Sequence, residues 1–310
     1  MNGENKIEIF KPLEEAFEVT KQVLFRPFAM KKWFVIGFAA WLAHLGTGSY
    51  NFNPNRQDWK DTPYVQNFAD WLSEIPRWIL VGGIVGLVVL ILAIAIVFAW
   101  LRARGHFMFI DCIVKNRGAI AEPWREFREQ GNSYFLFSLI IGILLAVIMG
   151  IAAVPFMLPL IRNVKFAHPD VYLICAIIAW AFVLVVIIFV WTLITHFMIV
   201  IMYRQRCRAR EGFRAAVALI SNYPGEITLY CLFWIVLAVG AAVASCAAIL
   251  ATCCTALLPY IGTVILLPVY VCLRSFGLRF VRQFGADFDV WAGIPQAPAS
   301  PTTEPPPLPG

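Results

Sequence analysis

The feature that most constrains this chain is a series of long apolar runs with almost no charge. Residues 78–101 contain no Asp, Glu, Lys, Arg or His. A helix needs about 20 apolar residues to cross the hydrocarbon core of a bilayer. Only 14% of the 310 residues are charged, whereas about 25% are charged in an ordinary soluble domain. The sequence therefore predicts a multi-pass membrane protein and excludes a water-soluble globule.

The apolar runs predict an all-α, polytopic transmembrane helix bundle with six spans. The runs are too long for barrel strands, and they lack the alternation of polar and apolar residues that such strands show. A secretory signal is the alternative for the first run, but about thirty residues rich in Glu precede it, and a signal begins with a short basic region. The predicted spans are residues 33–49, 78–101, 134–161, 171–203, 227–258 and 260–280.

Composition divides the chain into three segments. Residues 1–32 are charged and amphipathic, and we expect them to lie along the cytoplasmic interface. Residues 33–290 form the six-helix transmembrane domain. Residues 291–310 are rich in Pro, which predicts a disordered cytoplasmic tail; a polyproline ligand is the alternative reading.

Basic residues are sorted sharply between the loops. The two termini and the alternate loops that share their side hold 20 Lys and Arg residues, and the other loops hold 5. The positive-inside rule therefore places both termini in the cytoplasm, and we expect a bacterial inner-membrane protein. The net charge of +6 then lies on the cytoplasmic side, which favours anionic lipid as a partner over nucleic acid.

Short sequences recur at the predicted inner ends of the spans. A His-Phe-Met sequence begins at His106 and again at His196, and residues 273–277 resemble residues 101–105. This spacing suggests three helical hairpins, each introduced by an amphipathic cytoplasmic helix. In the first such helix an apolar stripe is predicted, formed by Phe10, Leu13, Phe17 and Leu24.

Small residues and prolines predict how the spans contact one another. Gly82 and Gly86 form a G-x-x-x-G sequence with Gly83 between them, which is typical of close helix contact in membranes. Three prolines within the third and sixth spans are predicted to kink or interrupt their helices, namely Pro155, Pro159 and Pro268.

Ionisable residues near the spans are the default indication of function in a membrane protein. Here they are few, and the candidate polar cluster at the inner interface consists of His106, Asp111 and His196. We expect Asp111 to form a local ion pair with Lys115 or Arg104. His44 lies near the outer end of the first predicted span. The chain has no zinc-binding spacing, nucleophile motif or P-loop, so we expect no enzyme activity, no metal and no cofactor.

A run of arginines follows the fourth predicted span. Such clusters attract anionic lipid headgroups, although they also act simply as topology determinants. The candidate headgroup-binding residues are Arg204, Arg206, Arg208, Arg210 and Arg214.

Residues 24–28, 32–34 and 37–43 resemble the opening of an uncharacterised bacterial family of six-span membrane proteins. More distantly, the layout of hairpins and amphipathic segments resembles the membrane domain of bacterial glycerophosphodiester phosphodiesterases. Neither resemblance implies site residues. The hydrolytic barrel is not implied either, because a TIM barrel takes about 250 residues and no predicted loop approaches that length.

Three functions follow as hypotheses. The favoured one is a non-enzymatic membrane scaffold that interacts with lipid headgroups, with a second copy of itself or with a membrane-protein partner. The alternative is a transporter or permease for a small or lipid-like solute. The third is a membrane-embedded enzyme that uses Asp111 with His106 and His196.

Overall fold

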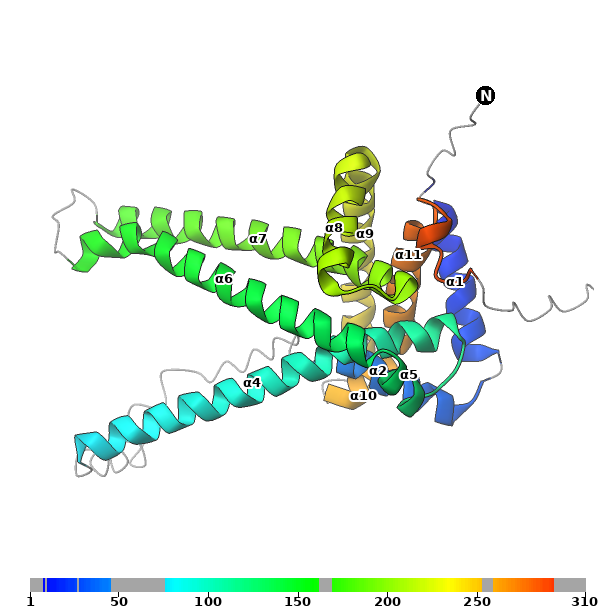
Figure 1. The fold of residues 1–310 in the computed structure, drawn as a ribbon, viewed down its shortest axis with the longest axis horizontal. Helices are drawn as coiled ribbons and strands as arrows, with labels where there is room; N and C mark the ends of the chain where they lie inside the picture. Colours follow the sequence, from blue (N-terminus) through cyan, green and yellow to red (C-terminus); the bar gives the residue numbers. More distant parts are fainter. Residues whose placement is uncertain are drawn as a thin grey trace, which may run out of the picture.

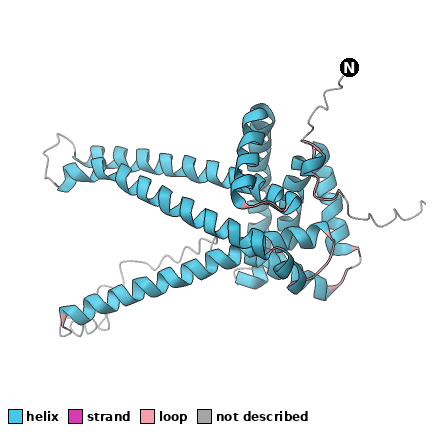
Figure 2. Cartoon of the chain, in the orientation of Figure 1, coloured by secondary structure: helices cyan, strands magenta, loops and turns pink. Residues whose placement is uncertain are grey.

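The computed structural model describes residue 8 and residues 10–26, 28–45, 76–161, 169–252 and 259–292. These residues are helical wherever they form regular structure (Figures 1 and 2), which confirms the all-α prediction. The α-helices are α1 (Phe10–Phe25), α2 (Met30–Ala43), α4 (Arg77–Val114), α5 (Ala121–Glu126), α6 (Arg128–Ile161), α7 (Pro169–Gln205), α8 (Ala209–Asn222), α9 (Pro224–Ala251), α10 (Pro259–Ile265) and α11 (Leu267–Arg282). A short 3-10 helix, η2 (Ala286–Phe288), follows α11.

Four of these helices, α4, α6, α7 and α9, are long and apolar enough to cross a membrane. They contain most of the predicted spans 78–101, 134–161, 171–203 and 227–258. Their length and composition indicate an integral membrane location.

The first and the last predicted spans are not shown as membrane-crossing helices. Helix α2 has 14 residues, which is about 21 Å at the helical rise, shorter than the roughly 30 Å hydrocarbon core. The sixth predicted span is divided between α10 and α11, and Pro268 lies in the first turn of α11. The predicted interruption at Pro268 is therefore confirmed, whereas α6 continues through Pro155 and Pro159.

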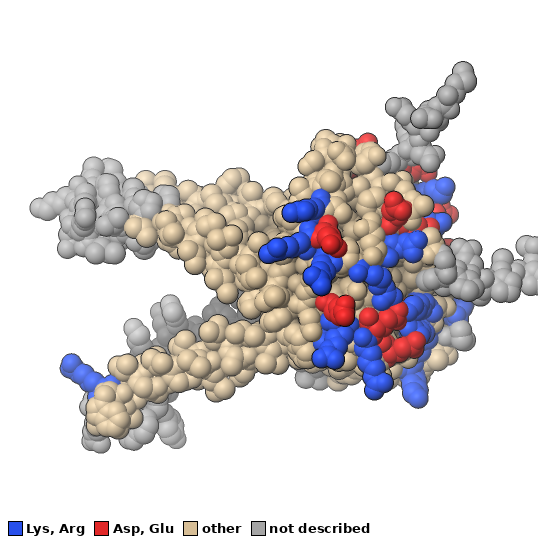
Figure 3. Space-filling model, viewed as in Figure 1, with Lys and Arg blue, Asp and Glu red and all other residues tan. Residues whose placement is uncertain are grey.

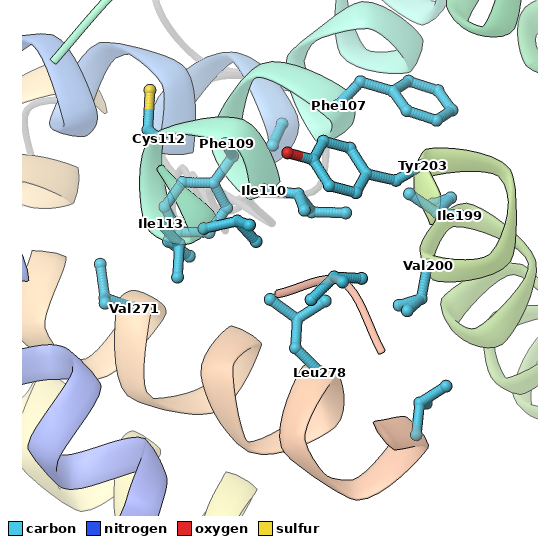
Figure 4. Packing of buried hydrophobic residues seen from close by; sticks show 14 of the residues in the cluster. Phe107, Phe109, Ile110, Cys112, Ile113, Ile199, Val200, Tyr203, Val271 and Leu278 are labelled. Carbon is cyan, nitrogen blue, oxygen red and sulfur yellow. The ribbon is translucent and has the colours of Figure 1, made fainter. Parts of the chain in front are cut away.

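The helices pack together at one end of the molecule, which we call the base. It comprises α1, α2, α5, α8, α10, α11 and the adjoining ends of α4, α6, α7 and α9. From the base, α4, α6 and α7 extend to one side, with α6 beside α7 and α4 diverging from both (Figure 1). The buried core shown in Figure 4 brings Phe107 and Ile110 of α4 together with Val200 of α7 and Leu278 of α11.

Outside the base, the long helices expose most of their apolar side chains, although Met149 of α6 and Ala176 of α7 are buried. The glycines of the predicted close contact, Gly82, Gly83 and Gly86, have no described atom within 4 Å of an added Cβ, and that prediction is wrong for the described residues. Lipid tails solvate such surfaces as well as a neighbouring helix does, so the hydrophobic effect does not force the apolar halves together.

Helix α2 runs antiparallel to the last third of α4. Lys32 Nζ at its start donates to Asn116 Oδ1 over 2.6 Å. At its end, a Cβ added to Gly105 of α4 would lie 2.6 Å from the backbone nitrogen of Ala43. Glycine at position 105 therefore permits the contact, because any side chain there would collide with the α2 backbone.

Three short helices, α1, α5 and α8, lie in the segments outside the long helices. Helix α5 contacts α4, α8 packs on α7, and α1 packs along α11. The predicted stripe of α1 is divided between two environments: Phe10 and Phe17 are 77% and 57% exposed, whereas Leu24 is buried and Leu13 packs against the core. The face that packs on the base carries the smaller residues Ala16, Val19 and Val23 together with Leu24.

Charged side chains gather on the base, and the long helices are almost free of them (Figure 3). The predicted tail after residue 292 and the residues 46–75 lie outside the described part of the chain.

Candidate functional site

A polar pocket of about 280 Å³ opens at the junction between the base and the long helices. Helices α2, α4, α6, α7, α9 and α11 or their ends all contribute to it. No Asp or Glu is among its described lining residues, which are Ala43, His44, Arg102, His106, Phe109, Tyr134, Trp191, Thr192, Thr195, His196, Ile199, Trp234, Tyr270, Leu273 and Arg274. The pocket is therefore cationic and aromatic in character.

Three histidines from different helices line this pocket. The ring centroid of His44 lies 6.5 Å from that of His106 and 4.7 Å from that of Tyr270. The third histidine, His196, comes from α7. The expectation that His44 lies near the outer end of a span is not met, because α2 is short and ends beside Gly105 in the last third of α4, next to His106.

Arg274 is the most unusual residue of the pocket. Its Nε and Nη2 atoms are buried and have no hydrogen-bond partner among the described residues. Arginine cannot lose its proton in a protein, and burying an unpaired charge is costly. Because Arg274 lines the pocket, an anion that entered it would compensate this buried charge.

His196 has the same property at one atom. Its Nε2 is buried and has no partner within the described part of the chain. The imidazole lies directly against the backbone of α11 at Gly277, where an added Cβ would collide with Nε2. Gly277, one turn after Arg274, thus allows α7 and α11 to approach closely enough to form the pocket.

A second arginine shows what a satisfied buried guanidinium looks like in this fold. Arg104 Nη2 donates to Asn132 Oδ1 over 3.0 Å. The guanidinium carbon lies 4.6 Å from the centre of the Trp100 ring and 4.7 Å from that of Trp124. Arg279 also has a buried Nε without a partner among the described residues, but its Nη1 pairs with Glu15, whereas no described ion pair includes Arg274.

An apolar groove of about 560 Å³ lies next to the pocket between α4 and α6. Arg102, Tyr134 and Trp191 line both spaces, so the two meet there. The groove is hollow because its walls carry small residues, notably Ala95, Ala99, Ala103, Gly142 and Ala146.

Asp111 is not in this pocket but in an ion-pair cluster within the base. Its carboxylate is fully buried and accepts hydrogen bonds from Tyr203 (3.0 Å) and Arg117 (3.0 Å) and pairs with Lys115 at 2.8 Å. The tyrosine hydroxyl points toward α4 in Figure 4. The predicted ion pair with Lys115 is confirmed, whereas Arg104 bonds Asn132 instead. The structure thus brings His106 and His196 to one pocket and places Asp111 elsewhere.

Glu126 of α5 extends the cluster across the base. It pairs with Lys115 at 2.9 Å and with Arg206. Burial opposes ionisation of Glu126, but the hydrogen bonds from Lys115 and Arg206 outweigh it and lower the pKa of its carboxyl group. The Arg206 guanidinium also lies 4.0 Å from the ring centre of Phe127. This cluster ties α4, α5 and the end of α7 together, which is a structural role.

The predicted arginine segment divides into two kinds of residue. Arg206 is engaged with Glu126, as described above. Arg208, Arg210 and Arg214 are exposed on or next to α8, and Arg204 is partly buried. No described carboxylate forms an ion pair with these four side chains, since the ion pairs of the described residues do not include them.

A metal centre is not indicated by the described residues, which contain no group of three His, Cys, Asp or Glu side chains suited to a metal ion. The free cysteines that the structure describes are dispersed over several helices.

Residues 7–290 match a family whose description reads "Family of unknown function (DUF7544)". The chain belongs to this family. No curated protein and no solved structure matches the chain. The family therefore assigns no activity, and the geometry of the site has to indicate one.

Three further residues of the pocket in this family member, Arg102, Tyr134 and Arg274, were not among the candidate site residues predicted from the sequence. A signal for two of them was present, because Arg102 and Arg274 occupy equivalent positions in the short matching sequences 101–105 and 273–277. Both arginines line the pocket, as do His106 and His196 from the His-Phe-Met sequences. The recurring sequences converge on one place in the fold.

Proposed function

We propose that this member of the family is a non-enzymatic, multi-span integral membrane protein whose base binds anionic lipid headgroups at the cytoplasmic face of a bacterial inner membrane. The observation that carries the proposal is the exposure of Arg210 and Arg214 on α8, without a described carboxylate partner, next to long helices that expose apolar side chains. Basic residues next to a span attract anionic headgroups by about 1 kcal/mol per charge.

Helix α1 supports the same orientation of the base. One face of α1 packs against α11. On the rest of the helix Phe10, Phe17 and Phe25 are exposed, as is the nearby Phe28. A helix with one face on protein and aromatic residues on another is suited to lie in the headgroup region.

The non-enzymatic part of the proposal is supported by the separation of the polar groups. The candidate acid, Asp111, is neutralised by Lys115 and Arg117 and does not line the pocket that holds His106 and His196. A general acid or base must reach the proton that it transfers.

The test is lipid selectivity in proteoliposomes. Spin-labelled phosphatidylglycerol is compared with spin-labelled phosphatidylcholine, and the fraction immobilised by the protein is measured by electron spin resonance. We expect the wild type to select phosphatidylglycerol, and the R210Q/R214Q variant to lose much of that selectivity. Raising the salt concentration should have the same effect, because exposed charges are screened.

The matched control is R206Q, which removes the same charge from an arginine already paired with Glu126. It should retain the wild-type selectivity. Equal immobilisation of the two lipids by the wild type would overturn the proposal.

Transport of a small or lipid-like solute is the second candidate, and one observation favours it. The polar pocket and the apolar groove meet at Arg102 and Tyr134, so a solute with both characters has a continuous place to lie. Flux of a labelled lipid between the leaflets of proteoliposomes would support transport, and its absence would leave a binding protein.

A further inference from the structure

We propose that the pocket around Arg274 is a specific binding site for the phosphate group of a lipid, with an acyl chain of that lipid in the groove between α4 and α6. This site lies inside the fold and does not rest on the exposed arginines of α8. The proposal rests on three features of the described residues: an unpaired buried guanidinium, a pocket without carboxylates, and a groove that continues from it.

The first feature requires an anion. The Nε and Nη2 atoms of Arg274 are buried without hydrogen-bond partners among the described residues, and the side chain lines the pocket. Arginine remains protonated, and guanidinium groups bind phosphate oxygens in a paired, planar geometry. An oxyanion in the pocket would compensate the charge of Arg274, which no described carboxylate does.

The second feature selects the charge of the ligand. Arg102 and Arg274 both line the pocket, and no described Asp or Glu does. Any cation would meet repulsion there, and a neutral solute would leave Arg274 uncompensated. A volume of about 280 Å³ accommodates a phosphate group with a small substituent.

The third feature selects an amphiphile over free phosphate. Along α4 the groove is lined by Ala95, Ala99 and Ala103, which recur every four residues on one face. The segment from the first to the last of these alanines is about 12 Å long at the helical rise. On the facing helix α6, Gly142 has no described atom within 4 Å of an added Cβ. The groove is thus an open apolar channel that points from the pocket along the uncharged part of α4.

The position of the two spaces fits a membrane lipid. The pocket belongs to the charged base, and the groove belongs to the apolar segment that is long enough to cross the bilayer. A lipid has its charged and apolar parts in the same order. The charged headgroup would therefore lie in the pocket while the acyl chain lies in the groove, so neither part of the lipid would be placed in surroundings of the opposite polarity.

The test compares three probes on the full-length protein in a neutral maltoside detergent. Octyl phosphate carries both features, inorganic phosphate carries only the anion, and octanol carries only the chain. We expect octyl phosphate to raise the melting temperature most and to bind at least about tenfold more tightly than either of the others, since charge-assisted hydrogen bonds and the chain both contribute.

Two variants test the two halves of the site. R274Q should weaken octyl phosphate by about tenfold or more, and the control R282Q should not, because Arg282 is on the same helix but pairs with Asp289 outside the pocket. G142L should fill the groove and weaken octyl phosphate, with little effect on inorganic phosphate. Since a Cβ at position 142 meets open space, this variant stays informative even if R274Q does not fold.

Several outcomes would overturn the proposal. Unchanged octyl phosphate affinity in R274Q would remove the phosphate site, and equal affinity for octanol would do the same. Equal affinity for inorganic phosphate, or no effect of G142L, would remove the lipid assignment. The R210Q/R214Q variant separates this site from the surface function: it should keep octyl phosphate binding while losing bulk lipid selectivity.

Discussion

Gly277 of α11 lies directly against the imidazole of His196 on α7, so closely that a Cβ at position 277 would overlap Nε2. This contact brings Arg274 and His196, which are distant in sequence, to the same pocket. The absence of one side chain thus allows the proposed phosphate site to form.

Replacing Gly277 with Ala should therefore displace His196. We expect G277A to lower stability by about 1–3 kcal/mol, as added atoms do in a packed interior, and to weaken octyl phosphate binding. Thermal unfolding of the detergent-solubilised protein checks the first effect and titration checks the second. G240A is the matched control, because Gly240 meets no described atom within 4 Å; a loss of stability as large in G240A would contradict the contact argument.

Removing the buried charge of Arg274 should stabilise the ligand-free protein. R274M has nearly the same length without the guanidinium, and an isolated buried cation is costly. We expect a higher melting temperature in the absence of ligand and a lost response to octyl phosphate. A lower melting temperature without any ligand would mean that Arg274 already has a stabilising partner.

Asp111 should matter for stability and not for lipid binding. D111N would leave Lys115 and Arg117 without their shared buried carboxylate, and breaking a buried ion pair costs about 3–5 kcal/mol. E122Q removes an exposed partner of Arg117, which also lies 3.7 Å from Glu126, and should cost about 1 kcal/mol or less. The two variants are compared by thermal unfolding, and equal losses would refute the distinction.

The ion pairs of Glu126 should make the stability of the packed base of the molecule sensitive to acid. Lys115 and Arg206 hold the pKa of Glu126 below its ordinary value of 4.5, despite the opposing effect of burial. A carboxyl group with a depressed pKa in the folded state stabilises the fold above its ordinary pKa, and this contribution is lost as the pH falls toward the folded value. The melting temperature of the wild type should therefore decrease below about pH 4.5 more steeply than that of E126Q. Parallel curves would show that Glu126 has no such role.

Topology is testable independently of any ligand. A reporter that is active only outside the cytoplasm, fused after residue 292, should be inactive, and the same reporter placed within residues 162–168 should be active. The sorting of Lys and Arg predicts this orientation. Activity of the terminal fusion would reverse it.

The apolar runs were sufficient to predict the long helices. The charge-free residues 78–101 lie entirely within α4, and α7 contains all of residues 171–203. Backbone hydrogen bonds within the helix are the only way for such runs to satisfy their polar groups in lipid, so hydropathy alone reads them correctly. Residues 33–49 misled the same reasoning, because a short apolar helix buried in protein has the same composition as a short span.

The site depended on contacts that no local pattern contains. His106 and His196 were identified because intramembrane ionisable residues are rare, yet Asp111 was grouped with them on that same basis and belongs to another cluster. The small residues were misread in a similar way: Gly82 and Gly86 contact no described helix, whereas Gly105 and Gly277 do. Glycines that permit a helix contact cannot be told from glycines that do not by their local sequence, because the difference lies in whether another helix is close to them.

The sequence by itself determined that this chain is helical, suited to a membrane and basic on one side, because hydropathy and charge act on each segment separately. Only the tertiary structure decided that His44, His106, His196 and Arg274 share one pocket, and that two nitrogen atoms of Arg274 have no hydrogen-bond partner among the described residues. The reason is physical: whether a buried charge is compensated depends on the atoms that other helices bring within about 3 Å of it, and those helices are far away along the chain.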